Sequence, residues 1–185
     1  MVDMNRDLIS YLDGKVTLHV GDLTGHDVDV IVNAANSSLM GGGGVDGAIH
    51  RMGGAKVTEA CRLIRQTTHP EGLPTGEVVI TPGGNLAAKY VIHTVGPIYG
   101  RHGGHEADLL AACYRNALAL AHQHRLSSIA FPSISTGAYG YPQSEAAEVV
   151  SKVLNGADFP SHIRLVFFES RQMDIFVRHQ KFRLT

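Results

Sequence analysis

The segment from Asn33 to Gly54 holds the residues of this chain that are best suited to chemistry. It reads NAANSSLMGGGGVDGAIHRMGG and combines two asparagines, four consecutive glycines and one carboxylate, Asp46. Glycine forfeits roughly 0.5 to 1 kcal/mol of backbone entropy relative to alanine in an ordered segment, so the run indicates that a ligand approaches the backbone closely. Because backbone N–H groups at the start of a helix bind phosphate, Gly41 to Gly47 is predicted to be an anion-binding loop ahead of a helix that starts near Val45.

Two further loops also follow predicted strands. Gly21, Asp22 and Leu23 come directly after the first strand. The Asp22 carboxylate could accept a hydrogen bond from an exocyclic amine such as that of adenine, or it could serve as a turn or helix-cap residue. The segment Ser133 to Pro142 reads SISTGAYGYP, and its small residues predict a second phosphate-binding loop, with a tight connection as the alternative.

Other familiar motifs are poorly matched. Gly42 to Gly47 fits GxGxxG formally, but it lies too far beyond the strand and lacks a well-placed ribose-binding acid, so a Rossmann site is not predicted. The chain has no GxxxxGK[ST] motif, and Ser135 is one residue out of step with a GxSxG nucleophile elbow.

Two close pairs of histidines raise the question of a metal site. His102 stands near His105, and His122 stands near His124. Neither pair has further ligands at zinc spacings, so these side chains are expected to be solvated and no metal is predicted.

The three loops belong to an alternation of predicted strands and helices. Strands are predicted over Lys15–Val20, Val28–Val32, Glu77–Thr81, Tyr90–Thr94, Ser128–Pro132 and Ile163–Phe168. Helices are predicted over Ala107–His124, over Gln143–Leu154 after Pro142, and over Val45–Gln66 as two helices separated at Gly53 and Gly54. Such alternation predicts a parallel or mixed sheet with helices on both faces and ligands at the carboxyl ends of the strands.

Length and composition predict a single domain over residues 1–185, since the chain is 44% hydrophobic. Residues 1–14 are expected to form an arm or short helix, and residues 169–185 a terminal helix with a solvated basic face. The net charge of -1 disfavours nucleic-acid binding. Isolated Cys61 and Cys113, with no leader-like segment, predict a cytoplasmic chain. No apolar run reaches the roughly 18 residues that span a bilayer, so no membrane contact is expected.

Three longer motifs point to a family. VIVNAANSSLMGGGGVDGAIH, VIHTVGP and AFPSISTGAYGYP resemble, in this order, the macrodomains, specifically the MacroD-type branch that includes bacterial O-acetyl-ADP-ribose deacetylases. The resemblance covers about Val16 to Phe168 and implies a three-layer α/β/α sandwich with a central mixed sheet and a cleft for ADP-ribose. One departure is that His50 is followed by Arg-Met-Gly-Gly, where relatives usually have an Ala-Ala-Gly ending. We expect this departure to alter helix packing and leave the cleft untouched.

The resemblance also implies roles for the loops. The loop of Asp22 and Leu23 matches the one whose aspartate contacts adenine, with Phe168 near the adenine face. Asn36 and Asp46 match the catalytic pair. The first diphosphate loop matches Gly43, Gly44 and Val45, and the second matches Ser135, Thr136, Gly137, Ala138 and Tyr139, with Tyr139 beside the distal ribose.

The implied reaction is hydrolysis of an ester of the distal ribose, which needs a positioned water and stabilisation of negative charge. Asp46 could orient or deprotonate the water, but an aspartate is a weak base, and the substrate diphosphate is the alternative activator. A helix N-cap is another possible role for Asp46. Asn36 could hold a ribose hydroxyl or be a turn residue. His50 and His93 are expected to be hydrogen-bonded packing residues rather than the base.

Three function classes follow. The first is a hydrolase of ADP-ribose esters, acting on O-acetyl-ADP-ribose and on mono-ADP-ribosylated proteins. The second is a non-catalytic ADP-ribose reader, which would not need Asp46. The third is an RNA or poly-ADP-ribose binding module, which the charge and the six Phe, six Tyr and no Trp disfavour. The hydrolase is therefore our prediction, and no cofactor is expected.

Overall fold

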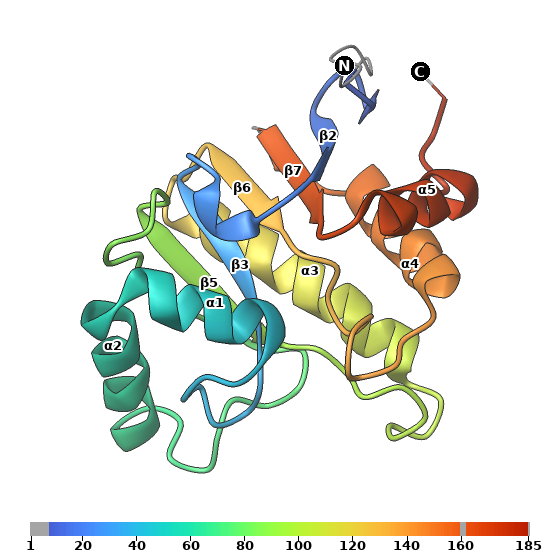
Figure 1. Cartoon of the computed structure of the whole chain (residues 1–185). Helices are drawn as coiled ribbons and strands as arrows, with labels where there is room; N and C mark the ends of the chain where they lie inside the picture. The colour runs from blue at the N-terminus through green and yellow to red at the C-terminus, as the bar shows by residue number, and fades with distance from the viewer. Residues whose placement is uncertain (1–7, 160–161, 185) are drawn as a thin grey trace.

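A seven-stranded mixed sheet forms the centre of the computed structural model, which describes residues 8–159 and 162–184 (Figure 1). The strand order is β1-β2-β7-β6-β3-β5-β4. The strands are β1 (Ser10–Tyr11), β2 (Val16–Val20), β3 (Val30–Ala35), β4 (Val78–Pro82), β5 (Tyr90–Val95), β6 (Ser128–Phe131) and β7 (His162–Phe167). The inner strands run parallel, whereas the edge strands β1 and β4 run antiparallel to their neighbours. The predicted mixed sheet is confirmed.

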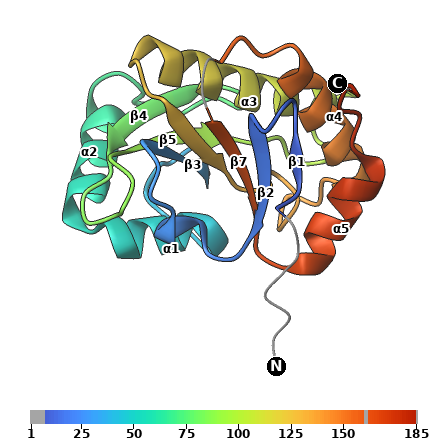
Figure 2. The same cartoon turned by 90° about the horizontal axis from the view of Figure 1, so that it is seen from above.

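Helices cover both faces of this sheet (Figure 2). The helices α1 (Gly44–Gly53) and α2 (Ala55–Gln66) lie on one face, and α3 (Glu106–Gln123), α4 (Gln143–Asn155) and α5 (Ser170–His179) lie on the other. The largest apolar core packs between the sheet and α3, α4 and α5, and includes Phe131, Leu110 and Phe176. The three-layer α/β/α sandwich is therefore confirmed.

A polar pair divides the sheet face beneath α1 and α2. Along β3, Ile31 and Ala35 belong to separate apolar clusters. Asn33 lies between them and pairs in register with His93 of β5. Both polar side chains are completely buried, so a polar layer separates two apolar ones at the centre of the domain.

The turn between β4 and β5 fixes the rear of α1. The helix ends at Gly53, and Gly54 follows with a φ of 74°, which favours glycine. Asn85 of the turn donates its backbone N–H to the Gly53 carbonyl at 3.0 Å. A Cβ at Gly84 would overlap that same carbonyl oxygen. The predicted break is confirmed. Because Gly53 and Gly84 have no side chains, the backbone at the end of α1 contacts the backbone of the turn between β4 and β5.

Two predicted elements differ from the structure. The strand predicted over Val28–Val32 begins at Val30 and runs on to Ala35, because its pairing with β5 continues to the end of that strand. In residues 8–14 the expected arm or short helix is instead a hairpin, with β1 antiparallel to β2 and a turn through Leu12 and Asp13 at positive φ. Residues 1–7 of that prediction lie outside the described residues.

The C-terminal helix is confirmed as α5, and its basic side chains are exposed, although the helix ends at His179, before Lys181 and Arg183. None of the helices among the described residues has the length and apolar character needed to cross a membrane.

Candidate functional site

A cavity of about 800 Å³ opens at the carboxyl ends of the parallel strands. This volume falls in the range of small-molecule sites, about 300 to 1,000 Å³. All the residues that the sequence analysis assigned to binding or catalysis line this cavity: Asp22, Leu23, Asn36, Gly43, Gly44, Val45, Asp46, Ser135, Thr136, Gly137, Ala138, Tyr139 and Phe168.

The first wall is the glycine loop that leads into α1. Gly43 is the N-cap of α1 and supplies no side-chain cap, so the first N–H groups of the helix are left for other acceptors. A Cβ on Gly43 or Gly44 would meet no atom within 4 Å, which means that this stretch of backbone borders open space. The N-cap role considered for Asp46 is wrong, because Asp46 lies inside the first turn.

The two oxygens of Asp46 face different surroundings. The side chain is only 5% exposed. Asn33 donates from Nδ2 to Oδ1 at 2.8 Å, and His50 Nε2 lies 3.5 Å from the same oxygen. On the other side, a Cβ at Gly42 would lie 3.2 Å from Asp46 Oδ2 and 3.3 Å from Asn36 Nδ2. Thus Oδ1 is held inside the protein, while Oδ2 and the Asn36 amide both lie beside Gly42, which lines the cavity.

Asn36 also shapes the loop. Its Oδ1 accepts hydrogen bonds from Ser38 N at 3.1 Å and Ser38 Oγ at 2.5 Å, and its Nδ2 donates to Gly41 O at 3.1 Å. The turn role is therefore confirmed. An amide nitrogen carries two hydrogens, so the same side chain retains one donor for a ligand.

The second wall is the loop after β6, where Ser135 has an unusual conformation. Its φ is 65°, in a region that costs a non-glycine residue about 1 to 3 kcal/mol. Its buried Oγ has no hydrogen-bond partner in the described residues, and it sits so close to Gly96 that a Cβ there would overlap it. Backbone strain and an unpartnered hydroxyl favour a ligand-binding loop over a simple connection.

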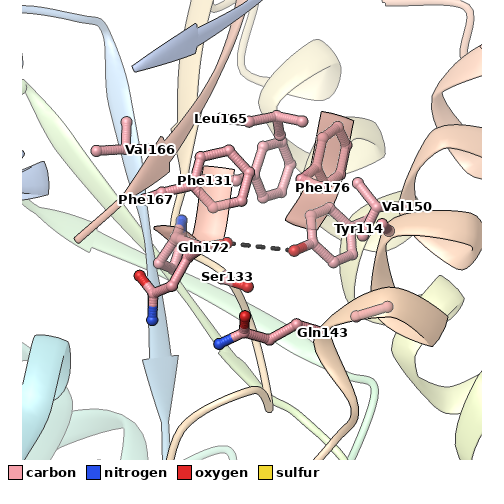
Figure 3. Close-up of a pocket in the computed structure, with 13 residues that line it drawn as sticks. Tyr114, Phe131, Ser133, Gln143, Val150, Leu165, Val166, Phe167, Gln172 and Phe176 are labelled. Carbon is pink, nitrogen blue, oxygen red and sulfur yellow. Dashed lines mark hydrogen bonds between the residues drawn. The ribbon is translucent and has the colours of Figure 1, made fainter. Parts of the chain in front are cut away.

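Tyr114 of α3 supports the base of this loop from behind (Figure 3). Its hydroxyl donates to Pro132 O at 3.2 Å and accepts from Ile134 N at 3.4 Å. Burial raises the pKa of Tyr114, so the hydroxyl keeps the proton that it donates. The adjoining pocket of about 20 Å³, lined by Phe131 and Ser133 among others, is too small for an organic ligand.

At the other end of the cavity, Asp22 is both a helix cap and a wall residue. Its Oδ1 accepts hydrogen bonds from Thr24 N at 2.9 Å and Thr24 Oγ1 at 2.7 Å, which caps the short 3-10 helix Leu23–Gly25. These bonds lower the pKa of Asp22. Phe168, just past β7, is 77% exposed at the cavity edge, so its ring is open to contact there.

Sequence reasoning missed two polar wall residues, Arg51 and Gln172. The expectation that the departure after His50 leaves the cleft untouched is wrong, because Arg51 lines the cavity. A Cβ at Gly47 would lie 3.0 Å from Arg51 Nη1. Gly47 and Arg51 are four residues apart, which puts them on one side of a helix. This spacing was the signal for Arg51 that the sequence offered.

The expectation for His50 and His93 is confirmed, since both are hydrogen-bonded packing residues. His50 Nδ1 lies 3.2 Å from Thr58 Oγ1. His93 Nδ1 lies 3.1 Å from Asn33 Nδ2, and its Nε2 lies 2.9 Å from Thr81 Oγ1. The sequence analysis did not link either histidine to Asp46. For His50 the signal was present, because it follows Asp46 by four residues on the same helix, whereas the link to His93 crosses from a strand to a helix and is not visible as spacing.

Of the histidines in the two close pairs, His105, His122 and His124 are exposed, as expected, whereas His102 is half-buried and accepts a hydrogen bond from Ile98 N at 3.1 Å. Across residues 8–159 and 162–184, no three His, Cys, Asp or Glu side chains are grouped so that they could hold a metal ion.

The fold and the cavity define a class of protein, the α/β/α sandwich with a ligand-sized cavity bordered by glycine-containing loops at the carboxyl edge of its sheet. Residues 32–150 match the family described as Macro domain, and the chain belongs to this family.

Two curated relatives illustrate the similarity. The chain is 52% identical over 163 residues to the O-acetyl-ADP-ribose deacetylase of Salmonella typhimurium, covering 85% of this chain and 89% of the relative. It is 49% identical over 166 residues to the Macro domain-containing protein TTE0995 of Caldanaerobacter subterraneus, covering 88% and 93%.

Solved structures agree in fold. The Oceanobacillus iheyensis macrodomain with ADP superposes with a TM-score of 0.85 at 46% identity, covering 89% of this chain and 88% of that one. The Trypanosoma brucei macrodomain in complex with ADP-ribose gives a TM-score of 0.75 at 37% identity, covering 89% and 68%.

Proposed function

We propose that this macrodomain binds ADP-ribose in the cavity and hydrolyses esters of its distal ribose, with O-acetyl-ADP-ribose as one substrate. The observation that carries the proposal is that Asp46 Oδ2 and the Asn36 amide both lie beside Gly42, in a cavity that is also lined by two glycine-containing loops. The relative named O-acetyl-ADP-ribose deacetylase and the related structures with ADP and ADP-ribose support it. A reader would need the loops but not the carboxylate.

In this proposal the ligand runs along the cavity from Asp22 to Asp46. The adenine lies between Asp22 and Phe168. The diphosphate lies between the glycine loop that begins α1 and the loop after β6. The distal ribose then reaches Asn36, Asp46 and Tyr139.

The reaction follows from this placement. A water oxygen adds to the ester carbonyl carbon as the activating group takes one water proton, and the bond from that carbon to the ribose oxygen breaks. The same proton then passes to the ribose oxygen, and the second water proton is lost to solvent as the acid leaves as a carboxylate. Asp46 Oδ2 orients the water or accepts its proton, and the substrate diphosphate is the alternative acceptor. The free N–H of Asn36 holds a ribose hydroxyl so that the ester stays within reach of the water.

The same bond joins ADP-ribose to acidic side chains of modified proteins. We therefore propose mono-ADP-ribosylated proteins as a second substrate class. We also propose a cytoplasmic location, which the free, buried cysteines Cys61 and Cys113 support.

The substitution Asp46→Asn tests the catalytic role. It keeps an Oδ1 acceptor for Asn33 and removes only the charge and the basic oxygen. We expect turnover of O-acetyl-ADP-ribose, followed by acetate release, to fall by about 10² or more, with ADP-ribose affinity little changed in calorimetry. Asp108→Asn makes the same change at an exposed carboxylate in the first turn of α3, and it should have no effect on either quantity.

Each proposed substrate has its own assay. Acetate release reports on the small ester, and release of ADP-ribose from a glutamate-automodified ADP-ribosyltransferase reports on the protein ester. If the wild-type chain binds ADP-ribose but turns over neither, the reader hypothesis replaces the hydrolase. If Asp46→Asn turns over both at the wild-type rate, another group activates the water.

A further inference from the structure

We propose that His93 is a positioning residue for ester hydrolysis, which acts through Asn33 to fix the orientation of the Asp46 carboxylate. The inference rests on the proposed function, because it concerns the same carboxylate. His93 lies on β5, beneath α1, and is completely buried, so it acts on the reaction from inside the protein.

Four buried side chains form one hydrogen-bond chain from the cavity to the edge of the sheet. Asp46 Oδ1 accepts from Asn33 Nδ2 at 2.8 Å, and the same Nδ2 lies 3.1 Å from His93 Nδ1. His93 Nε2 continues to Thr81 Oγ1 at 2.9 Å. The exposed fractions are 5% for Asp46, 0% for Asn33 and His93, and 2% for Thr81.

The direction of each hydrogen bond in this chain is determined by chemistry. An amide nitrogen only donates, so one hydrogen of Asn33 Nδ2 goes to Asp46 and the other goes to His93 Nδ1, which must accept. The proton of a neutral imidazole is then on Nε2, where it is donated to Thr81 Oγ1. Burial, with a smaller effect of nearby His50, lowers the pKa of His93 to about 3, which keeps the ring neutral and its Nδ1 lone pair free.

In this arrangement two acceptors, Asp46 Oδ1 and His93 Nδ1, disfavour the reversed orientation of the Asn33 amide. Rotated by half a turn, Asn33 would place its Oδ1 against both Asp46 Oδ1 and His93 Nδ1, and all three atoms are acceptors. His93 is therefore a second acceptor, beside Asp46, that holds the Asn33 amide with its NH₂ group toward the carboxylate. With Oδ1 held in this way, Oδ2 is left beside Gly42 and the Asn36 amide, where the proposed water lies.

Stability alone does not explain the chain. Asn33 Oδ1 is buried without a partner in the described residues, which typically costs about 1 to 3 kcal/mol. The pair of Asn33 and His93 also separates two apolar clusters that an apolar pair would join. Replacing buried polar groups by packed apolar ones is often neutral or stabilising. The feature that the polar chain serves is the carboxylate at its end.

The first test compares two substitutions at His93. His93→Phe keeps a ring in the same space and removes the acceptor. His93→Asn keeps an acceptor at the second atom beyond Cβ, where Nδ1 was. We expect His93→Phe to lower kcat on O-acetyl-ADP-ribose by about 10-fold to 100-fold, the range expected for misplaced reacting groups, with the Kd for ADP-ribose within about twofold of wild type. His93→Asn should recover most of the lost kcat.

A double-mutant cycle identifies the route of the effect. If His93 acts through Asn33, adding His93→Phe to Asn33→Ala should lower kcat little further, because residues that act as a unit are not additive. Thr94→Val is the matched control. Thr94 is the next residue of β5, is completely buried and donates to Glu77 O at 2.9 Å, but it does not belong to the chain. This substitution should lower the melting temperature without changing kcat.

A spectroscopic measurement separates this proposal from the proposed function. The imidazole ¹⁵N shifts of His93 in the wild-type protein at neutral pH should show an unprotonated Nδ1 and a protonated Nε2, whether or not the protein is active. Any one of four results would overturn the positioning role. These are the opposite tautomer, a wild-type kcat in His93→Phe, no recovery of kcat in His93→Asn, and additive effects on kcat in the double-mutant cycle. Absence of turnover in the wild-type chain would refute the proposed function first, before any variant is compared.

Discussion

Asp22 caps a short 3-10 helix and also lines the cavity. Two substitutions can therefore separate its capping role from its proposed contact with adenine. Asp22→Ala removes the acceptor of both Thr24 hydrogen bonds, and losing an N-cap costs about 0.5 to 2 kcal/mol. For a chain of this length, each kcal/mol lowers the melting temperature by roughly 2 to 4 °C. Asp22→Asn keeps an Oδ1 acceptor, and asparagine is as good a cap as aspartate, so its melting temperature should stay close to wild type.

Binding should follow a different order from stability. Both known hydrogen bonds use Oδ1, which leaves Oδ2 for the adenine amine. Asp22→Asn places an NH₂ group at this position, which donates and so cannot accept a hydrogen bond from the adenine amine. Asp22→Ala places no polar group there. A hydrogen bond to a charged group contributes about 1.5 to 3 kcal/mol, so the affinity for ADP-ribose should fall roughly 10-fold to 150-fold in both variants.

Calorimetry with two ligands and thermal unfolding measure these effects. Ribose 5-phosphate lacks adenine and should bind both variants as it binds wild type, much more weakly than ADP-ribose. Wild-type affinity of Asp22→Asn for ADP-ribose would show that Asp22 is only a cap. An equal loss of affinity for ribose 5-phosphate would show that the cavity as a whole had been disturbed.

Two further predictions concern the second loop and the response to pH. A Cβ at Gly137 would meet no atom within 4 Å, so Gly137→Val should leave thermal unfolding unchanged. Its side chain should fill part of the cavity and lower the affinity for ADP-ribose, measured by calorimetry, at least about tenfold, or about 1.4 kcal/mol. Normal binding would contradict the loop assignment. Burial, reinforced by His26 and Arg164, lowers the pKa of His19 to about 4, so between pH 6.5 and 4 the unfolded state takes up a proton that the folded state excludes, and stability must fall as the pH falls through this window. Urea unfolding at pH 7 and pH 5 should show a smaller loss in His19→Gln than in wild type, and an equal loss would contradict the reasoning.

Most of the fold could be predicted because its elements are short apolar strands and helices with clear boundaries. The break at Gly53 and Gly54 was visible because two glycines interrupt a helical pattern. The end of β3 was not, because Asn33 and two alanines have little strand propensity and are extended only by pairing with β5. The hairpin of β1 was missed although the sequence carried a signal for it, because its turn is centred on Asp13 and Gly14 at positive φ and Asp-Gly is typical of two-residue hairpin turns.

The predicted site residues share one cavity, because loops that follow parallel strands meet at one edge of the sheet. What the sequence could not reveal is the set of buried side chains beneath the cavity. His93 lies far from Asp46 along the chain and reaches it only through Asn33, a link made by strand register. Arg51 reaches the cavity because α1 turns its face there, and the orientation of a helix is set by packing rather than by motif.

The contact between Gly53 and Gly84 makes the far end of α1 part of the same mechanical unit as the cleft. The helix has 10 residues and so spans about 15 Å. Its front carries Asp46 and the free N–H groups, while its rear rests on the turn between β4 and β5 with no side chain in between. A side chain added at Gly84 would push the rear of a rigid rod, and the displacement would reach the carboxylate at its front. A saturation screen for inactive variants should therefore find a second group of positions that do not tolerate substitution. These positions lie around the turn between β4 and β5, away from the ligand cavity.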